Sequence, residues 1–114
     1  EVLAQHPETV ACYALTSHDN VPMVRAVEQA GMADRVSVVG TDLNQSTSDM
    51  LRKGQLKAVL NQAAYMKGYA AMYILVDRVV KNIEPPRRFD CQIDVVIRSN
   101  LSFYERSNNI IAWR

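Results

Sequence analysis

VSVVGTDLN, residues 36–44, joins an apolar run of strand length to a polar segment. Val36 to Gly40 is almost wholly apolar, which is typical of a strand that is buried on both faces. Thr41, Asp42 and Asn44 follow it with side chains that donate or accept hydrogen bonds. Ligands of open parallel sheets bind outside the carboxyl ends of the strands. The stretch therefore predicts a buried strand that places Asp42 where a ligand can bind.

Three further apolar segments have the length of strands. Residues 10–15, VACYAL, lead into the polar stretch 16–20, TSHDN. Residues 57–61 contain the run Ala-Val-Leu and lead into NQAAY, residues 61–65. Residues 93–97, IDVVI, form the last candidate. The sequence therefore predicts four strands, three of which end in polar groups.

Segments with helical spacing separate these strands. Residues 23–30 place apolar side chains three and four positions apart, and Gly31 follows as a helix-ending residue. Residues 46–49, STSD, have the form of a capping box, with Ser46 as the cap and a carboxylate three residues later. The short helix that begins there is expected to end near Gly54.

The longest predicted helix covers residues 66–83. Its apolar side chains follow three- and four-residue spacing, and a second apolar flank lies beside them. A helix of this kind is expected to be buried by more than its own sheet. Pro85-Pro86 should end it, because proline cannot continue the hydrogen-bonding pattern of a helix.

This alternation of strands and helices predicts an α/β fold: a parallel sheet with right-handed crossovers and helices on both faces. A chain of 114 residues has the length of one domain. We expect the domain to cover residues 1–104 and residues 105–114 to form a tail. No helix or strand is assigned to residues 102–114.

The composition argues against several classes of protein. Hydrophobic residues make up 48% of the chain and charged residues 22%, which is typical of a folded globular domain. The net charge is +1 and the basic residues are scattered, so no basic face for DNA is predicted. No apolar run approaches the ~20 residues of a membrane span. Cys12 and Cys91 form no disulfide framework.

Signatures of catalysis are missing from the sequence. Ser17, His18 and Asp19 are adjacent, so their side chains diverge, whereas a catalytic triad needs groups that converge from separate segments. The two histidines and two cysteines do not have the spacing of metal ligands. Neither a dinucleotide-binding glycine motif nor a phosphate-binding loop is present. We expect no enzymatic activity, no metal and no cofactor.

The polar strand ends instead suggest a binding site. An aspartate, a glutamine and neighbouring polar groups can hold the hydroxyls of a sugar, while an aromatic ring can cover an apolar sugar face. The candidate ligand-binding residues are Asp42, Gln62, Ser17, His18, Asp19 and Tyr65.

Structural roles compete with these assignments. Asp19 or Asn20 can cap the following helix, and Asn44 can serve a turn or a cap. Tyr65 can pack at the start of its helix, and His18 can be an ordinary surface histidine.

Four segments in the right order resemble one family. VSVVGTDLN (36–44) is similar to the V-S-V-V-G-F-D strand of lac-repressor-type regulators and type I periplasmic sugar-binding proteins. RAVEQAGMADR (25–35) resembles the helix before that strand, and residues 51–75 resemble the segment that carries the family's glutamine. IDVVIRSNLSFY (93–104) is similar to the final strand in the version found among the regulators.

The resemblance implies a two-lobed clamshell that holds a sugar or another small metabolite between its lobes. Residues 1–104 match the C-terminal lobe. Asp42 matches the family's ligand-binding aspartate and Gln62 its ligand-binding glutamine. The stretch 16–20 stands where the family carries a further polar contact.

The function implied is the effector-binding lobe of a lac-repressor-type transcriptional regulator. Such a protein is cytoplasmic and dimeric, and it contacts DNA only through a domain absent from this chain. Self-association is expected through residues 66–83 together with Ile110, Ile111 and Trp113. The alternative is a lobe of a periplasmic sugar-binding protein of a transport system. A phosphoacceptor receiver domain fits poorly, because Lys57 precedes its strand instead of following it.

Overall fold

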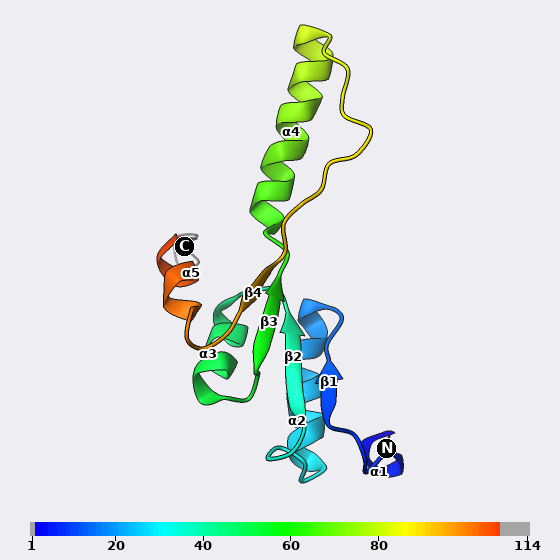
Figure 1. Cartoon of the computed structure of the whole chain (residues 1–114), viewed down its shortest axis with the longest axis vertical. Helices are drawn as coiled ribbons and strands as arrows, with labels where there is room; N and C mark the ends of the chain where they lie inside the picture. The colour runs from blue at the N-terminus through cyan, green and yellow to red at the C-terminus, as the bar shows by residue number, and fades with distance from the viewer. Residues whose placement is uncertain (1, 108–114) are drawn as a thin grey trace. The chain divides into compact units, whose positions relative to one another are not determined.

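The computed structural model describes residues 2–107 (Figure 1). Its elements run in the order α1 (Val2–Gln5), β1 (Ala11–Tyr13), the 3₁₀ turn η1 (Ser17–Asp19), α2 (Asn20–Gln29), β2 (Ser37–Thr41), α3 (Gln45–Lys53), β3 (Ala58–Asn61), α4 (Ala64–Lys81), β4 (Asp94–Val96) and α5 (Leu101–Ser107). The chain divides into two compact units. In the described part, the sheet unit comprises residues 2–61 and 95–107, and the helix unit comprises Gln62–Asp94.

The sheet has the strand order β1-β2-β3-β4. β1, β2 and β3 are parallel, with Cys12 opposite Val38 and Gly40 opposite Val59. The ribbon of β4 runs in the opposite direction to that of β3 (Figure 1). The predicted α/β fold, with a parallel sheet built by strand–helix alternation, is therefore confirmed, and an antiparallel edge strand makes the sheet a mixed one.

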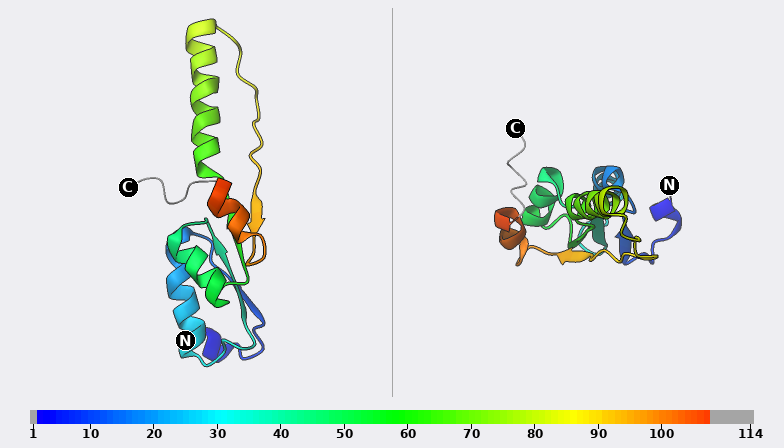
Figure 2. Two further views of the ribbon diagram at one scale, coloured as in Figure 1. Left: turned by 90° about the vertical axis from the view of Figure 1, so that its left-hand side faces the viewer. Right: turned by 90° about the horizontal axis from the view of Figure 1, so that it is seen from above.

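Both crossover helices of the sheet unit cover the same face, whereas helices on both faces were predicted. α2 and α3 lie on one side of the sheet when the protein is viewed from above (Figure 2). This follows from the strand order, because successive right-handed crossovers that move in one direction place their helices on one face.

The hydrophobic core lies between this face and the two helices. Burial alternates along the second strand: Val36, Val38 and Gly40 are buried, whereas Ser37 and Val39 are only half-buried. The core comprises Val24, Val27, Met32, Val36, Val38, Leu51, Leu56, Val59, Val96 and Leu101. The apolar strands were expected to be buried on both faces. From Val36 to Gly40, the structure shows full burial only on the face that α2 and α3 cover.

The first turn of α3 differs from the prediction. Its N-cap is Asn44, whose side-chain oxygen accepts a hydrogen bond from the Thr47 N–H at 3.0 Å. The Thr47 hydroxyl accepts one from the Asn44 N–H at 2.8 Å, which completes the capping box. The predicted cap at Ser46 was wrong by two residues, because Asn and Thr form the same reciprocal pair as Ser and Glu. The predicted end at Gly54 is confirmed, with φ of 76°.

The helix unit contains α4, an 18-residue helix with no buried residue. It ends at Lys81 and is capped by Asn82 at φ 52°, three residues before the first of the two prolines. Tyr69 lies between two other tyrosines, with ring centroids 6.4 Å from Tyr65 and 4.8 Å from Tyr73. A hydrogen bond with Tyr73 raises the pKa of Tyr69. Extensive burial of this helix, which its two apolar sides predicted, is not found in the structure.

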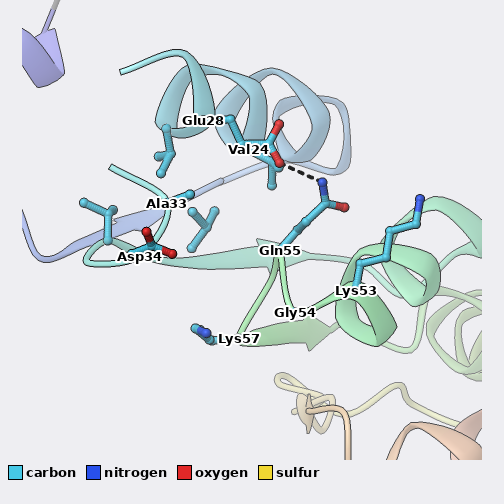
Figure 3. Close-up of a pocket in the computed structure, with 11 residues that line it drawn as sticks. Val24, Glu28, Ala33, Asp34, Lys53, Gly54, Gln55 and Lys57 are labelled. Atoms are coloured by element: carbon cyan, nitrogen blue, oxygen red, sulfur yellow. Dashed lines mark hydrogen bonds between the residues drawn. The ribbon is translucent and has the colours of Figure 1, made fainter. Parts of the chain in front are cut away.

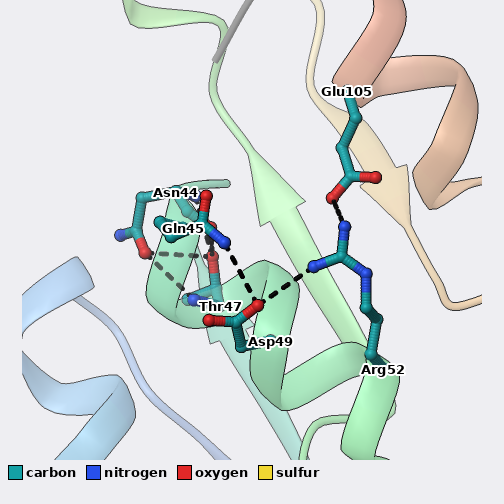
Figure 4. Close-up of polar contacts among 6 residues, drawn as sticks. All are labelled: Asn44, Gln45, Thr47, Asp49, Arg52 and Glu105. Carbon is teal, nitrogen blue, oxygen red and sulfur yellow. Dashed lines mark hydrogen bonds and ion pairs between the residues drawn. The ribbon is translucent and has the colours of Figure 1, made fainter. Parts of the chain in front are cut away.

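A helix, α5, begins the segment that the sequence left unassigned. Its first residue, Leu101, is buried at 3% exposure and joins the core. Before it, the Asn100 side chain accepts a hydrogen bond from the Ile97 N–H at 2.8 Å and donates one to the Val95 carbonyl at 3.0 Å. Glu105 pairs with Arg52 of α3 (Figure 4). Ile110, Ile111 and Trp113 lie outside the described residues.

Candidate functional site

Three polar segments follow the carboxyl ends of the parallel strands in the sheet unit. Residues 16–19 follow β1, Thr41 to Asn44 end and follow β2, and Asn61 ends β3. Neighbouring parallel strands bring these ends to one edge of the sheet. We call this edge the carboxyl edge.

Thr41 is braced by two other elements. The Asn20 side chain of α2 donates to the Thr41 carbonyl at 2.8 Å and accepts from the Thr41 N–H at 3.0 Å. The Thr41 hydroxyl donates to the Ala14 carbonyl at 2.7 Å and lies 3.0 Å from the Tyr13 hydroxyl. Asn20 and Thr41 are 1% and 2% exposed, so this network is enclosed in protein. The ends of β1 and β2 are thereby joined to the start of α2.

Asp42 has a left-handed backbone with φ of 63°. Few residues other than glycine adopt this conformation, and aspartate is one of those that tolerate it. The Asp42 N–H donates to the Leu60 carbonyl at 2.9 Å, and the Asp42 carbonyl accepts from the Thr47 hydroxyl at 3.0 Å. The residue is half-buried. Its backbone is thus held on both sides at the carboxyl edge, as expected for a residue that directly follows a buried strand.

Asn61 is a polar residue at this edge that the sequence analysis did not select. Its side-chain oxygen lies 3.5 Å from the Leu43 N–H, which donates to it, and the residue is half-buried. The signal for it was present in the sequence: an amide at the last position of a strand whose neighbour ends in Asp42.

The segment after β1 forms the 3₁₀ turn η1. Ser17 is half-buried, whereas His18 and Asp19 are exposed. The Thr16 hydroxyl donates to the Asp19 carboxylate at 2.8 Å. Asp19 is the N-cap of α2 but makes no side-chain capping bond. The capping role considered for Asp19 is therefore not seen, and Asn20 uses its side chain to bind Thr41.

Gln62 and Tyr65 belong to the helix unit, in contrast to the other candidates. Gln62 directly follows Asn61, and its side-chain oxygen lies 3.4 Å from the Lys67 ammonium, which donates to it. Tyr65 is 72% exposed and stacks on Tyr69. The structure therefore brings Asp42, Asn61 and residues 16–19 into one unit, and Gln62 and Tyr65 into the other.

A hollow of about 320 Å³ lies beside the residues that precede β2 and β3, at the strand ends opposite to Asp42. Figure 3 shows the residues that line it. Buried valines of α2 and β2 form part of its wall, and charged residues, among them Glu28 and Lys57, surround it. The Gln55 side chain bridges it by donating to Glu28 at 2.8 Å. A second hollow of about 370 Å³ lies in the helix unit, beside Met66 and Phe89. Neither hollow includes a candidate residue of the carboxyl edge.

The described residues were also compared with the patterns of metal sites and membrane-spanning helices. Across residues 2–107, no three histidine, cysteine or acidic side chains gather in a way that could hold a metal ion. The same residues contain no helix long and apolar enough to span a membrane.

Comparisons with known proteins identify the family to which the chain belongs. A family model described as "Periplasmic binding protein domain" matches residues 1–82. The chain belongs to this family. No curated protein sequence matches it.

Solved structures of the same fold include sugar-binding proteins and a regulator. A glucose-galactose binding protein from Geobacillus stearothermophilus superposes with a TM-score of 0.78 at 25% identity, over 88% of this chain and 35% of its own. An ABC transporter solute binding protein from Agrobacterium vitis with bound D-fucose gives 0.78 at 28% identity, over 94% and 37%. A protein designated a LacI transcriptional regulator, from Bacteroides fragilis, gives 0.76 at 18% identity, over 90% and 35%.

These solved structures confirm that the chain has the fold of a part of a type I periplasmic binding protein. Sugar-binding proteins and a LacI-type regulator share this fold. The chain spans about a third of the length of the solved proteins that it matches. These relatives are binding proteins and a regulator, not enzymes.

Proposed function

We propose that this chain is a sugar-binding lobe that holds its ligand at the carboxyl edge, with Asp42 as the principal contact. The observation that carries the proposal is the fixed backbone of Asp42, which follows a buried strand and is bonded through both its N–H and its carbonyl. The carboxylate of a half-buried residue whose backbone is fixed can accept charge-assisted hydrogen bonds from two sugar hydroxyls.

Other candidates supply the remaining contacts in this proposal. In the sheet unit, the amide of Asn61 can donate to and accept from a hydroxyl, and Ser17 and His18 add polar groups after the first strand. Gln62 and the exposed Tyr65, which belong to the helix unit, stay predictions from the sequence, as an amide that can bind a hydroxyl and a ring that can cover an apolar sugar face. Asp19 already accepts from the Thr16 hydroxyl, so a ligand would share its carboxylate.

The ligand would be enclosed only when a second lobe closes over the carboxyl edge. The chain spans 35% to 37% of the relatives described above, so two thirds of a protein of their length lie outside it. The isolated chain should therefore bind a sugar weakly, because an open edge leaves most of the ligand in water.

Two biological settings fit such a lobe. The resemblance of residues 93–104 to the final strand in the version found among the regulators supports the effector-binding lobe of a cytoplasmic lac-repressor-type regulator, which would act as a homodimer and contact DNA through another domain. The identities of 25% and 28% to sugar-binding and solute-binding proteins support the alternative, a periplasmic component of a transport system. Both settings use the same lobe chemistry.

Titration of the chain with D-fucose, D-galactose and D-glucose, followed by amide NMR spectra, tests the proposal. Binding at millimolar sugar should shift the amide signals of Asp42, Leu43 and Asn61 and those of residues 16–19. The signals of Lys53, Gln55 and Lys57, which line the hollow at the other end of the strands, serve as an internal control. Shifts confined to that hollow would contradict the proposed site.

A further inference from the structure

We propose that Asn20 is a positioning residue: its buried amide holds the Thr41 peptide and so fixes the Asp42 carboxylate relative to residues 16–19. The inference rests on the proposed function, since it assigns a part in ligand binding to a residue with no contact to the ligand. Asn20 is 1% exposed, so a bound sugar would not reach it.

The Asn20 side chain forms hydrogen bonds with both the backbone N–H and the backbone carbonyl of Thr41. Its Nδ2 donates to the Thr41 carbonyl at 2.8 Å, and its Oδ1 accepts from the Thr41 N–H at 3.0 Å. These distances are those of good hydrogen bonds, and both are buried. A buried pair of this kind determines the position and orientation of the Thr41 backbone, because any rotation of the peptide would break one bond or both.

Sequence neighbours connect this pair to the candidate site. Asn20 directly follows the turn η1 (Ser17–Asp19), and Thr41 directly precedes Asp42. The Asn20–Thr41 pair therefore links the polar segment after β1 to the one after β2. Bonds from Thr47 and to Leu60 hold Asp42 from the other side. The Asp42 backbone is thus fixed by groups from α2, α3 and β3.

Gly40 shows how closely this side chain approaches the strand. A Cβ atom added at Gly40 would lie 2.7 Å from Asn20 Oδ1 and 3.2 Å from Leu56 Cδ1. The first distance is shorter than real Cβ contacts allow. The glycine before Thr41 and the asparagine at the start of α2 therefore depend on each other, and a side chain at position 40 would push the amide away from Thr41.

A helix-capping role does not explain Asn20. A capping asparagine stands before the helix and accepts from an N–H of the first turn. Asp19 holds that position here, whereas Asn20 is the first helical residue and bonds across 21 positions of sequence to β2. The side chain serves the strand end and not the helix end.

The decisive experiment compares Asn20→Ala with Val27→Ala in the complete 114-residue chain. Val27 is also a buried residue of α2, at 2% exposure, so its truncation should lower the melting temperature without touching Thr41. Amide NMR spectra and hydrogen exchange of Thr41 and Asp42 are measured for both variants. We expect Asn20→Ala to shift both signals and to speed exchange of the Thr41 N–H by about tenfold beyond any global loss of stability. We expect Val27→Ala to leave both signals in place.

Titration with D-fucose adds the functional readout. Asn20→Ala should weaken binding about fivefold or more at a temperature where both variants are folded, and Val27→Ala should not. If the wild-type chain binds none of the three sugars, the proposed function fails while the NMR comparison still tests the positioning. Unchanged Asp42 signals in Asn20→Ala, or equal loss of affinity in both variants, would overturn the inference.

Two further variants keep the inference testable if Asn20→Ala does not fold. Asn20→Asp keeps an acceptor for the Thr41 N–H but places an oxygen against the Thr41 carbonyl, so it should also shift the Asp42 signal. Gly40→Ala should lower the melting temperature of the wild-type chain by forcing the amide away. It should lower that temperature less in the Asn20→Asp background, where one of the two bonds is already lost. Full additivity of the two changes would count against the proposed coupling.

Discussion

Asn44 and Thr47 each use a side-chain oxygen to accept a hydrogen bond from the other's backbone N–H, at 2.8 and 3.0 Å (Figure 4). The same Thr47 hydroxyl donates to the Asp42 carbonyl at 3.0 Å. The start of α3 is therefore tied to the residue that we propose as the main sugar contact. The cap of α3 and the position of the Asp42 backbone both depend on the Thr47 hydroxyl.

Replacement of Asn44 by alanine should destabilise the chain. The Thr47 N–H would lose its capping acceptor, which typically costs about 1 kcal/mol of unfolding free energy. Chemical denaturation measures this change. Ser46→Ala is the matched control: Ser46 is exposed and was the cap expected from the sequence, so its loss should change the free energy by less than about 0.5 kcal/mol. A larger effect at Ser46 than at Asn44 would contradict the observed cap.

Replacement of Asp42 by asparagine should weaken sugar binding while sparing the fold. Asparagine also tolerates the left-handed backbone, so the melting temperature should stay nearly constant. Loss of a charge-assisted hydrogen bond should raise the Kd for the best-binding sugar about tenfold, which corresponds to ~1.4 kcal/mol. NMR titration and thermal unfolding of the same variant provide both measurements.

Asp34→Asn is the matched control for this change. It removes one negative charge from an exposed residue beside the hollow at the other end of the strands. It should leave the sugar affinity unaltered. A large fall in the melting temperature of Asp42→Asn with unchanged affinity would show that Asp42 has a structural role, and our site assignment would be withdrawn.

The chain alone should not bind DNA. Its net charge is +1, and its basic side chains are scattered instead of clustered on one face. Several of them are already paired with acids, including Arg52 with Asp49 and Arg78 with Glu84. Electrophoresis of duplex DNA with micromolar protein should show no salt-sensitive shift. Such a shift would require a basic surface that the sequence does not predict.

The strands of the sheet unit could be predicted because their apolar runs are local signals. Val36 to Gly40 indicated β2, and the polar residues after it correctly marked the carboxyl edge, where Asp42 is half-buried. The exact start of α3 could not be fixed, since Asn44 and Ser46 are both good capping residues. Only the structure shows which of them meets Thr47.

Long-range contacts were beyond prediction from one sequence. Asn20 looked like a capping residue because nothing local indicates a partner 21 positions away. The division of the candidates between two units was also missed: Asn61 and Gln62 are adjacent in sequence but belong to different units. α5 was missed because the segment after Asn100 is short, and its contacts with the core come from only two residues, the buried Leu101 and the partly buried Tyr104.

The exposed stripe on α4 should drive self-association of the chain. Tyr69, Tyr73, Val76 and Val80 recur at three- and four-residue spacing, and their exposed fractions range from 44% to 74%. Contiguous apolar surface of this kind usually marks an interaction site. Sedimentation over a wide concentration range should show dimers or larger species. A clean monomer throughout would refute the expected homodimer.

A pair of charge substitutions identifies the surface responsible. Tyr73→Glu lies in the centre of the stripe, where removal of an aromatic anchor and introduction of a charge should raise the dissociation constant about tenfold or more. Val10→Glu is the control, since Val10 is 73% exposed in the sheet unit and lies far from α4 in sequence. Dissociation caused by Tyr73→Glu alone would locate the interface on α4. Equal effects of the two changes would mean that association is non-specific and that α4 is not the interface.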